Sequence, residues 1–240
     1  MDTASVMSGA SRRERGVALV VILMAMLFLM ALGLALVLNT STEALVAANF
    51  RSSQMAFYAA EAGIERVLPD LRHLADWSEA LSGAVRSSFV DGPPAGVRPI
   101  PGGGEVDPVR AQNLLNCGQE GGCTPAEMDT IREDRSWGRN NPRWTLYGYG
   151  PLEAVLPPGG ARSPFYVIVL VADDPAENDN DPTRDGMAPG NPGAGVLRLR
   201  ADAFGPGGAR RALEVRVTRD RVLGSAQPTA IGLRSWREIR

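Results

Sequence analysis

The sequence predicts an α+β protein in which one long N-terminal helix packs on a small antiparallel β-sheet. Three observations support this fold class. An apolar run from Val17 to Leu38 leads into a helical pattern with no proline before Pro69. Four β-rich runs follow in the C-terminal half, and residues 91–104 between the helix and those runs are rich in glycine and proline. A helix with a small sheet beside it is one of the stable two-layer arrangements.

The apolar run 17–38 is long enough to cross a membrane. Its 22 residues, at about 1.5 Å each, match the roughly 30 Å hydrocarbon core of a bilayer. Arg12, Arg13 and Arg15 precede the run and predict that the leader stays in the cytoplasm, with the body on the other side. A cleaved signal peptide would have a shorter apolar centre, of about 7 to 15 residues. An uncleaved signal anchor remains an alternative.

The helical pattern continues well beyond the apolar run. Charged residues such as Glu43 and Arg51 lie off the apolar face, and we predict one helix from Val17 to about Leu68 with that face against a globular body. The small and apolar residues that recur at steps of three and four are Ala44, Leu45, Ala48, Ser52, Met55, Ala56, Ala59, Gly63, Ile64 and Val67.

Two segments, RERGVALVVILMAMLFLM and NFRSSQMAFYAAEAGIERVL, resemble the N-terminal region of PilX-like minor type IV pilins. The resemblance covers about Arg12 to Leu68 and implies a pilin-like fold. It also implies that a prepilin peptidase cuts after Gly16 and methylates the new N-terminal Val17. The implied protein has no enzymatic activity, resides in the inner membrane with its head outside the cytoplasm, and then enters a pilus at the cell surface.

The resemblance also implies partners and a division of the chain. The partners are other minor pilins and the major pilin, contacted through the helix, the prepilin peptidase, and a PilY-type tip adhesin. The expected parts are a leader at 1–16, a helix at 17–68 that is transmembrane at 17–38, a head at 69–223 and a tail at 224–240. The sequence does not decide whether the tail is mobile or covers a sheet edge.

The fifth residue of the implied mature chain is Val21, whereas major pilins usually have glutamate there. In filaments this glutamate is thought to pair with the N-terminal ammonium of a neighbouring subunit, because both charges would otherwise be unpaired in an apolar setting. A subunit without it fits a priming position at or near the pilus tip. Three alternatives stay open: Val21 is one more anchor residue, the protein is a K-type-like minor pseudopilin of type II secretion, or it is a plain signal-anchored membrane protein.

Composition and motifs exclude several function classes. The formal net charge is -2. Loss of the leader, which has three arginines and two carboxylates, changes it to -3. We therefore expect no basic surface that binds nucleic acid. The single histidine, His73, has no nucleophile motif around it, which argues against an enzyme. Gly102–Gly104 lacks the lysine and following helix of a phosphate-binding loop.

Cys117 and Cys123 are the only cysteines in the chain. An even count in an exported protein favours a disulfide between them. A zinc site is disfavoured because His73 is far away in the sequence and other soft ligands are lacking. After the second cysteine, Thr124, Pro125 and Glu127 form an N-terminal capping pattern that predicts a short helix to about Arg135.

The C-terminal half predicts the sheet. The last two runs alternate apolar and polar residues and are joined by Gly205–Gly208, which predicts a hairpin. The alternation also predicts that one face of the sheet is wet and that the other covers the helix. We interpret residues 91–104 as a surface loop. The predicted strands are 143–149, 165–172, 195–204 and 209–219.

An acidic loop, 173–186, separates the second and third of these strands. It contains six carboxylates, and calcium takes six to eight oxygen ligands from such side chains. The spacing does not match an EF-hand, and acidic residues are also common in solvated turns. Calcium binding and a bare turn both remain open, and no other cofactor is predicted. The expected calcium ligands are Asp174, Asp179, Asp181 and Asp185.

Overall fold

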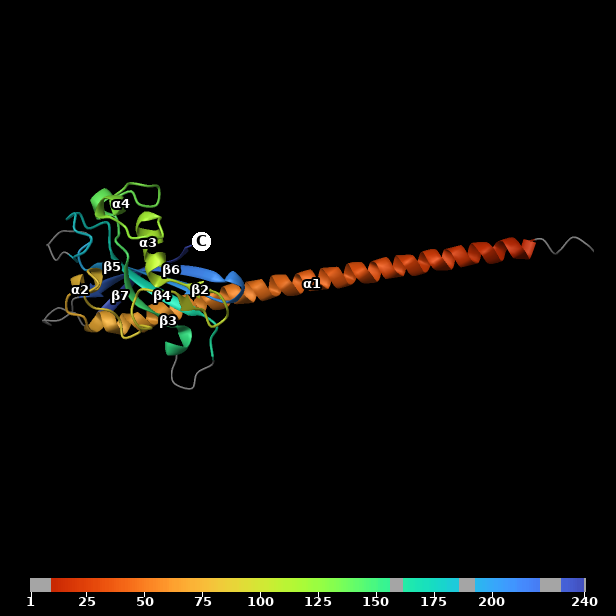
Figure 1. The fold of residues 1–240 in the computed structure, drawn as a ribbon, viewed down its shortest axis with the longest axis horizontal. Coiled ribbons are helices and arrows are strands. Elements are labelled where there is room, and N and C mark those ends of the chain that lie inside the picture. Colours follow the sequence, from red (N-terminus) through yellow and green to blue (C-terminus); the bar gives the residue numbers. More distant parts are fainter. Residues whose placement is uncertain (1–9, 156–161, 186–192, 221–229, 240) are drawn as a thin grey trace, which may run out of the picture. The chain divides into compact units, whose positions relative to one another are not determined.

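A computed structural model describes residues 10–155, 162–185, 193–220 and 230–239, with the side chains of residues 10–15, 220 and 230 left out. Most of the predicted leader, part of the predicted tail (224–229 and 240) and the end of the acidic region therefore lie outside the described residues. The chain divides into two units, 1–50 and 51–240, and each is described by itself. Helix α1, Ala10–His73, contributes to both (Figure 1).

The described elements follow the predicted order. The helices are α1, α2 (Ser78–Leu81), α3 (Pro108–Cys117) and α4 (Pro125–Met128), with 3₁₀ turns η1 (Gly138–Asn140), η2 (Leu152–Ala154) and η3 (Pro206–Gly208). The strands are β1 (Arg98–Pro99), β2 (Glu105–Val106), β3 (Thr145–Pro151), β4 (Tyr166–Asp173), β5 (Val196–Phe204), β6 (Arg210–Asp220) and β7 (Ala230–Ile239).

In the first unit, α1 is a continuous helix whose side chains from residue 16 to 50 are all exposed. Its polar residues beyond the apolar run are compatible with the helix because their hydroxyls bond back to earlier carbonyls. Thr40 donates to the carbonyl of Leu36 at 2.9 Å, and Thr42 donates to that of Leu38 at 3.0 Å. These bonds let the helix pass from apolar to polar sequence without a break.

In the second unit, α1 runs past the predicted end at Leu68 and includes Pro69. Leu71 lies beyond the proline and is buried in the core, so packing holds the last turn in helical form. The indole nitrogen of Trp77 donates to the Leu71 carbonyl at 3.0 Å, and Arg219 donates to the Leu74 carbonyl at 3.1 Å. Side chains from outside the helix thus satisfy carbonyls at its end.

Five strands form one antiparallel sheet in the order β3-β4-β5-β6-β7. All four predicted strands are confirmed, as is the β5–β6 hairpin. Its turn needs Gly207, which has φ 62° and ψ 22°, a left-handed conformation that glycine adopts without steric cost. Strand β7 was not predicted; it forms one edge of the sheet, so the second half of the tail belongs to the head.

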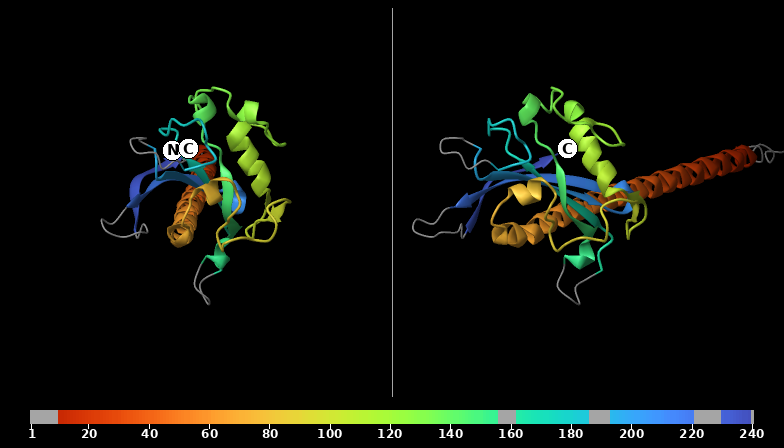
Figure 2. Two further views of the ribbon diagram at one scale, coloured as in Figure 1. Left: turned by 90° about the vertical axis from the view of Figure 1, so that its left-hand side faces the viewer. Right: turned by 60° about the vertical axis from the view of Figure 1, so that its left-hand side comes forward.

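One face of the sheet packs on α1. Small residues line the helix where it meets the sheet, namely Ala56, Ala59, Ala60 and Gly63, and all are buried. Figure 2 shows the sheet curving around this part of the helix. The small residues of the AFYAAEAGIE segment therefore allow helix and sheet to approach closely.

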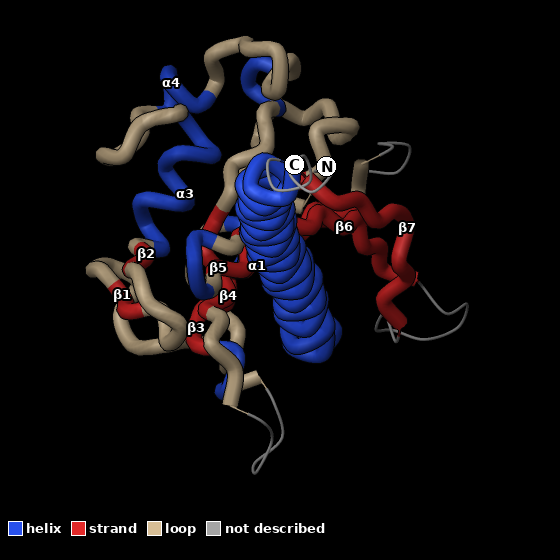
Figure 3. The backbone as a smooth tube through the Cα atoms, turned by 90° about the vertical axis from the view of Figure 1, so that its right-hand side faces the viewer, coloured by secondary structure: helices blue, strands red, loops and turns tan. Residues whose placement is uncertain are grey.

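The other face of the sheet is not uniformly wet, which corrects the prediction. Every residue of β4 is buried, and its outward-facing Ile168 and Leu170 belong to a second apolar cluster with Trp144 and partly buried residues of α3. Figure 3 shows α3 and α1 on different sides of the strands. The head is therefore a three-layer structure at β3 and β4.

Smaller elements also differ from expectation. The helix after Thr124 ends at Met128 rather than near Arg135, although the predicted capping box is present, with Glu127 Oε2 2.7 Å from the Thr124 backbone nitrogen. Helix α3 was not predicted, and the 91–104 loop contains the short strand β1, which pairs with β2. Asp107 caps α3 by accepting from two backbone N–H groups.

Candidate functional site

The predicted processing junction lies at the start of the described helix. Gly16 and Val17 are both exposed, and a Cβ at Gly16 would have no neighbour within 4 Å. Nothing in the described structure therefore covers the bond between them.

The surface of the first unit is continuously apolar. Large hydrophobic side chains from Val17 to Leu38 are between 52% and 76% exposed. Among the described residues, one helix is long and apolar enough to cross a membrane. Its most apolar 18-residue stretch has a mean hydropathy of 3.0, and none of that stretch is buried. So much exposed apolar surface requires lipid or other apolar helices around it.

Val21 is exposed on this surface. No ionisable residue occurs between Val17 and Thr42, and Glu43 is the first carboxylate after the junction. Glu43 accepts a hydrogen bond from Asn39 at 3.2 Å on the same helix. The segment from Val17 to Thr42, with Val21 in it, thus carries no charged side chain.

A cluster of carboxylates forms a second candidate site, in the head. Asp173 at the end of β4, Glu177 and Asp185 are all buried, and one oxygen from each lies within 4.8 Å of the others. Oxygens at this separation could share one calcium ion, whose bonds to oxygen are about 2.3–2.6 Å long. Gly193 packs directly against the backbone of Glu177, where any side chain would clash.

The charges in the cluster act on one another. The pKa of Asp173 is raised to about 9, first by burial and then by the negative charges of Glu177, Asp185 and Asp179, against one backbone hydrogen bond that lowers it. Burial also raises the pKa of Asp185, although a hydrogen bond from Gly195 and the charge of Arg219 oppose this. A bound cation or a proton would relieve this crowding of negative charge.

The four predicted calcium ligands do not all lie together. Asp185 belongs to the buried cluster, whereas Asp174 lies 3.7 Å from Arg216 on the sheet. Asp179 and Asp181 are on a turn, where the Asp181 N–H donates to Asp179 at 2.9 Å. Asp173 and Glu177 were not among the predicted ligands, although Asp173 directly follows a predicted strand of almost wholly apolar residues, 165–172.

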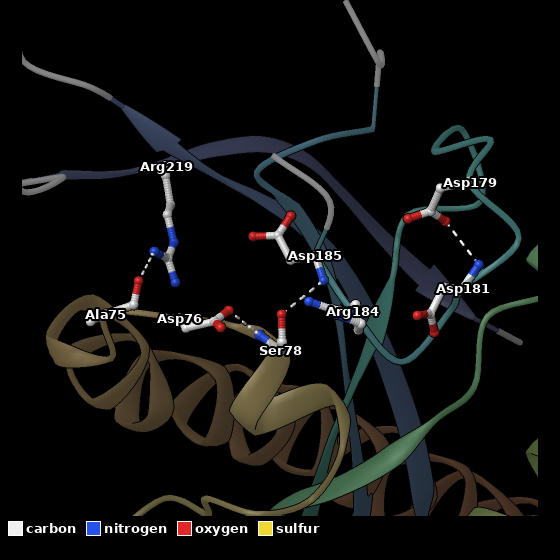
Figure 4. Close-up of a pocket in the computed structure, with 8 residues that line it drawn as sticks. All are labelled: Ala75, Asp76, Ser78, Asp179, Asp181, Arg184, Asp185 and Arg219. Carbon is white, nitrogen blue, oxygen red and sulfur yellow. Dashed lines mark hydrogen bonds between the residues drawn. The ribbon is translucent and has the colours of Figure 1, made fainter. Parts of the chain in front are cut away.

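An open pocket of about 340 Å³ adjoins the cluster (Figure 4). Three of the four predicted ligands line this pocket, namely Asp179, Asp181 and Asp185. Asp185 lies between the turn that carries Asp179 and Asp181 and the segment that carries Asp76. Arg219 also lines it, and its guanidinium stacks 4.2 Å from the ring centroid of Trp77. The pocket therefore contains both signs of charge.

Two other predicted features can be placed. Cys117 and Cys123 form a disulfide that joins the end of α3 to the segment before α4. His73 is the last residue of α1 and is exposed.

A long apolar N-terminal helix whose C-terminal part packs on an antiparallel sheet defines a pilin-like α+β protein. Residues 15–65 match the protein family described as PilX N-terminal. This range begins beside the predicted cleavage site and ends within the buried helical segment, so it includes the junction and the apolar surface. No curated protein and no solved structure matches the chain.

Proposed function

We propose that this protein is a minor type IV pilin, a structural subunit that primes pilus assembly and sits at or near the pilus tip. The observation that carries the proposal is the apolar, uncharged surface of α1 directly after Gly16, within the region that matches the PilX N-terminal family. Such a surface suits two environments in turn, the bilayer before assembly and the helices of neighbouring pilins afterwards.

The proposed sequence of events begins at the junction. A prepilin peptidase cuts after Gly16 and methylates the amino group of Val17. The apolar helix then leaves the inner membrane and packs against the helices of other minor pilins and the major pilin. Val21 offers no carboxylate to a subunit placed above it, so a position with nothing above it is favoured, next to a PilY-type adhesin.

The first experiment measures intact mass and N-terminal sequence of the protein from cells with and without their prepilin peptidase. We expect a methylated Val17 start that disappears in the peptidase-deficient cells. A chain that keeps residues 1–16 in both strains would refute the pilin proposal in favour of a signal-anchored protein. Deletion of the pilus and type II secretion assembly genes, one system at a time, then distinguishes pilin from pseudopilin by which deletion abolishes surface exposure of the head.

The tip position has its own test. Immunogold labelling of the head should mark filament ends in wild type, and Val21→Glu should move part of the label along the shaft. Val20→Glu, with the same charge one residue away, is the matched control and should not do so. Label along the whole shaft in wild type would contradict the tip position.

We propose, second, that the head binds calcium through Asp173, Glu177 and Asp185. Three buried carboxylates whose oxygens approach within 4.8 Å support this proposal. Calorimetric titration with CaCl₂ should show binding that Asp173→Asn abolishes and that Glu105→Gln, an exposed control on β2, leaves intact. Equal heats for Asp173→Asn and wild type would refute it, without bearing on the pilin proposal.

A further inference from the structure

The outer face of strands β5, β6 and β7 carries arginines where α3 does not cover the sheet. We call Arg200, Arg210, Arg216 and Arg237 the arginine face. Their side chains lie on the face opposite α1, because Leu199, Leu213 and Val215 between them belong to the core against the helix. Alternation along a strand puts the neighbours of those residues on the other side.

Two buried carboxylates on this face, Asp202 and Glu214, lie beneath arginines. Asp202 accepts from Arg200 at 2.8 Å and from Arg210 at 2.9 Å. Glu214 accepts from Arg237 at 3.1 Å and also from the buried Arg198. The two carboxylates are therefore shared, each between two guanidinium groups.

On this face the positive groups are exposed and the negative groups are buried. The side chains of Arg210, Arg216 and Arg237 are 54%, 43% and 62% exposed, whereas those of Asp202 and Glu214 are buried. Solvent therefore meets guanidinium groups on this face, although the chain as a whole has a formal net charge of -2. With Arg198 and Asp174 included, five arginines face three carboxylates in the described part of the chain, an excess of two positive charges.

The face is also hollowed at one end. A pocket of about 240 Å³ at this end of the sheet is lined by Arg200, Arg210, Arg211, Ala212 and Ile239. Arg211 reaches it from the α1 side of β6, where its guanidinium is paired with Glu238 at 3.2 Å. A carboxylate group is small enough to enter it. Guanidinium groups bind carboxylates with paired, charge-assisted hydrogen bonds, so the pocket favours an acidic side chain.

The arrangement favours a polypeptide over a nucleic acid. Proteins that bind DNA through its backbone commonly neutralise about 6–10 phosphates, and an excess of two charges falls well short. Single-stranded nucleic acid also needs open aromatic surfaces for base stacking. Phe204 on this face is covered by Arg210, whose guanidinium lies 5.1 Å from the ring centroid.

We propose that the arginine face binds an acidic polypeptide segment of a partner protein. From Arg210 to Arg216 the exposed guanidiniums are six residue steps apart along β6, or about 20 Å at 3.3 Å per step. An extended segment with two or three carboxylates spans this length. Electrostatic complementarity of this kind selects the partner and speeds its association.

The test uses the full chain in a neutral detergent and a fluorescein-labelled deca-glutamate peptide, with fluorescence anisotropy as the readout. Replacing Arg210, Arg216 and Arg237 together by Gln should weaken binding about tenfold, since exposed ion pairs each contribute modestly. The matched control replaces Arg72, Arg110 and Arg139, which are exposed elsewhere, and should stay within twofold of wild type. Binding of wild type should weaken as NaCl rises.

Other outcomes overturn the proposal. The proposal is wrong if both triple variants lose the same peptide affinity, if the wild type does not bind the peptide, or if the wild type binds a 20-nucleotide DNA more tightly than the peptide. If the Gln variant does not fold by circular dichroism, the single Arg237→Glu variant replaces it and should weaken binding at least threefold. This result does not depend on the proposed tip position, because it is measured on the isolated chain.

Discussion

Gly63 of α1 lies against Val167 and Val169 of β4, and its replacement tests the packing of the head. A Cβ at this position would lie 2.5 Å from Cγ1 of Val167 and 3.2 Å from Cγ2 of Val169. Both valines are fully buried and cannot turn into solvent. Overpacking of this kind costs about 1–3 kcal/mol, whereas alanine gains about 1 kcal/mol over glycine in a helix. We expect Gly63→Ala to lower the free energy of unfolding by up to about 2 kcal/mol.

The assay is urea unfolding of the detergent-solubilised chain, followed by the fluorescence of the buried Trp77 and Trp144. The matched control is Gly33→Ala in the same helix. A Cβ at Gly33 has no neighbour within 4 Å, so the unfolding transition of the head should not move.

A double-mutant cycle isolates the contact. In a Val167→Ala background, the methyl that Gly63→Ala meets is gone, and the glycine replacement should then cost much less than in wild type. The reasoning is refuted if Gly63→Ala destabilises the head equally in both backgrounds, or if it stabilises the wild type.

Glu214→Ala should destabilise the head by about 3–5 kcal/mol, because it leaves Arg198 buried without its carboxylate; thermal melting that matches wild type would contradict this. Burial opposes ionisation of Glu214, but the charges of Arg198 and Arg237 outweigh burial and lower the pKa of this carboxylate. The stability that Glu214 contributes is therefore present above its ordinary pKa of 4.5 and is lost as the pH falls below that value. Glu214→Gln should flatten that acid-side loss in pH-dependent melts, and an unchanged profile would exclude Glu214 as the cause. Reducing the disulfide between Cys117 and Cys123 should cost about 2 kcal/mol for so short a loop, measured by melting with and without dithiothreitol, with Cys117→Ser/Cys123→Ser insensitive to the reagent.

The sequence predicted the parts of the fold that follow from local periodicity. The long helix, the four strands 143–149, 165–172, 195–204 and 209–219 and the β5–β6 hairpin each have a pattern that one segment carries by itself. The PilX-like resemblance of the N-terminal region was confirmed over residues 15–65.

The missed elements depend on contacts between segments. Strand β7 alternates poorly because a bulge lies opposite Arg216 and Val217 and shifts its register. The helix continues through Pro69 because Leu71 packs in the core beyond it, which a proline rule cannot anticipate. Helix α3 had a readable signal in Asp107 followed by Pro108, a capping residue before a proline at the first helical position.

The acidic site shows the same limit. Composition located the loop, but the grouping of Asp173 with Glu177 and Asp185 depends on how the loop folds back toward Gly193. A count of charged residues could not distinguish the cluster residues from Asp174, which lies beside an arginine of β6. The net charge likewise did not predict the arginine face, because the carboxylates of this face are buried and its arginines are exposed.

The packing of α1 on the sheet has a mechanical consequence. Its buried residues from Ala56 to Leu71 are spread along the helix axis and contact the sheet over several turns. A pull along that axis therefore loads these contacts in shear, all at the same time, instead of peeling them apart one by one. The head should resist traction transmitted through its own helix far better than the same force applied across it.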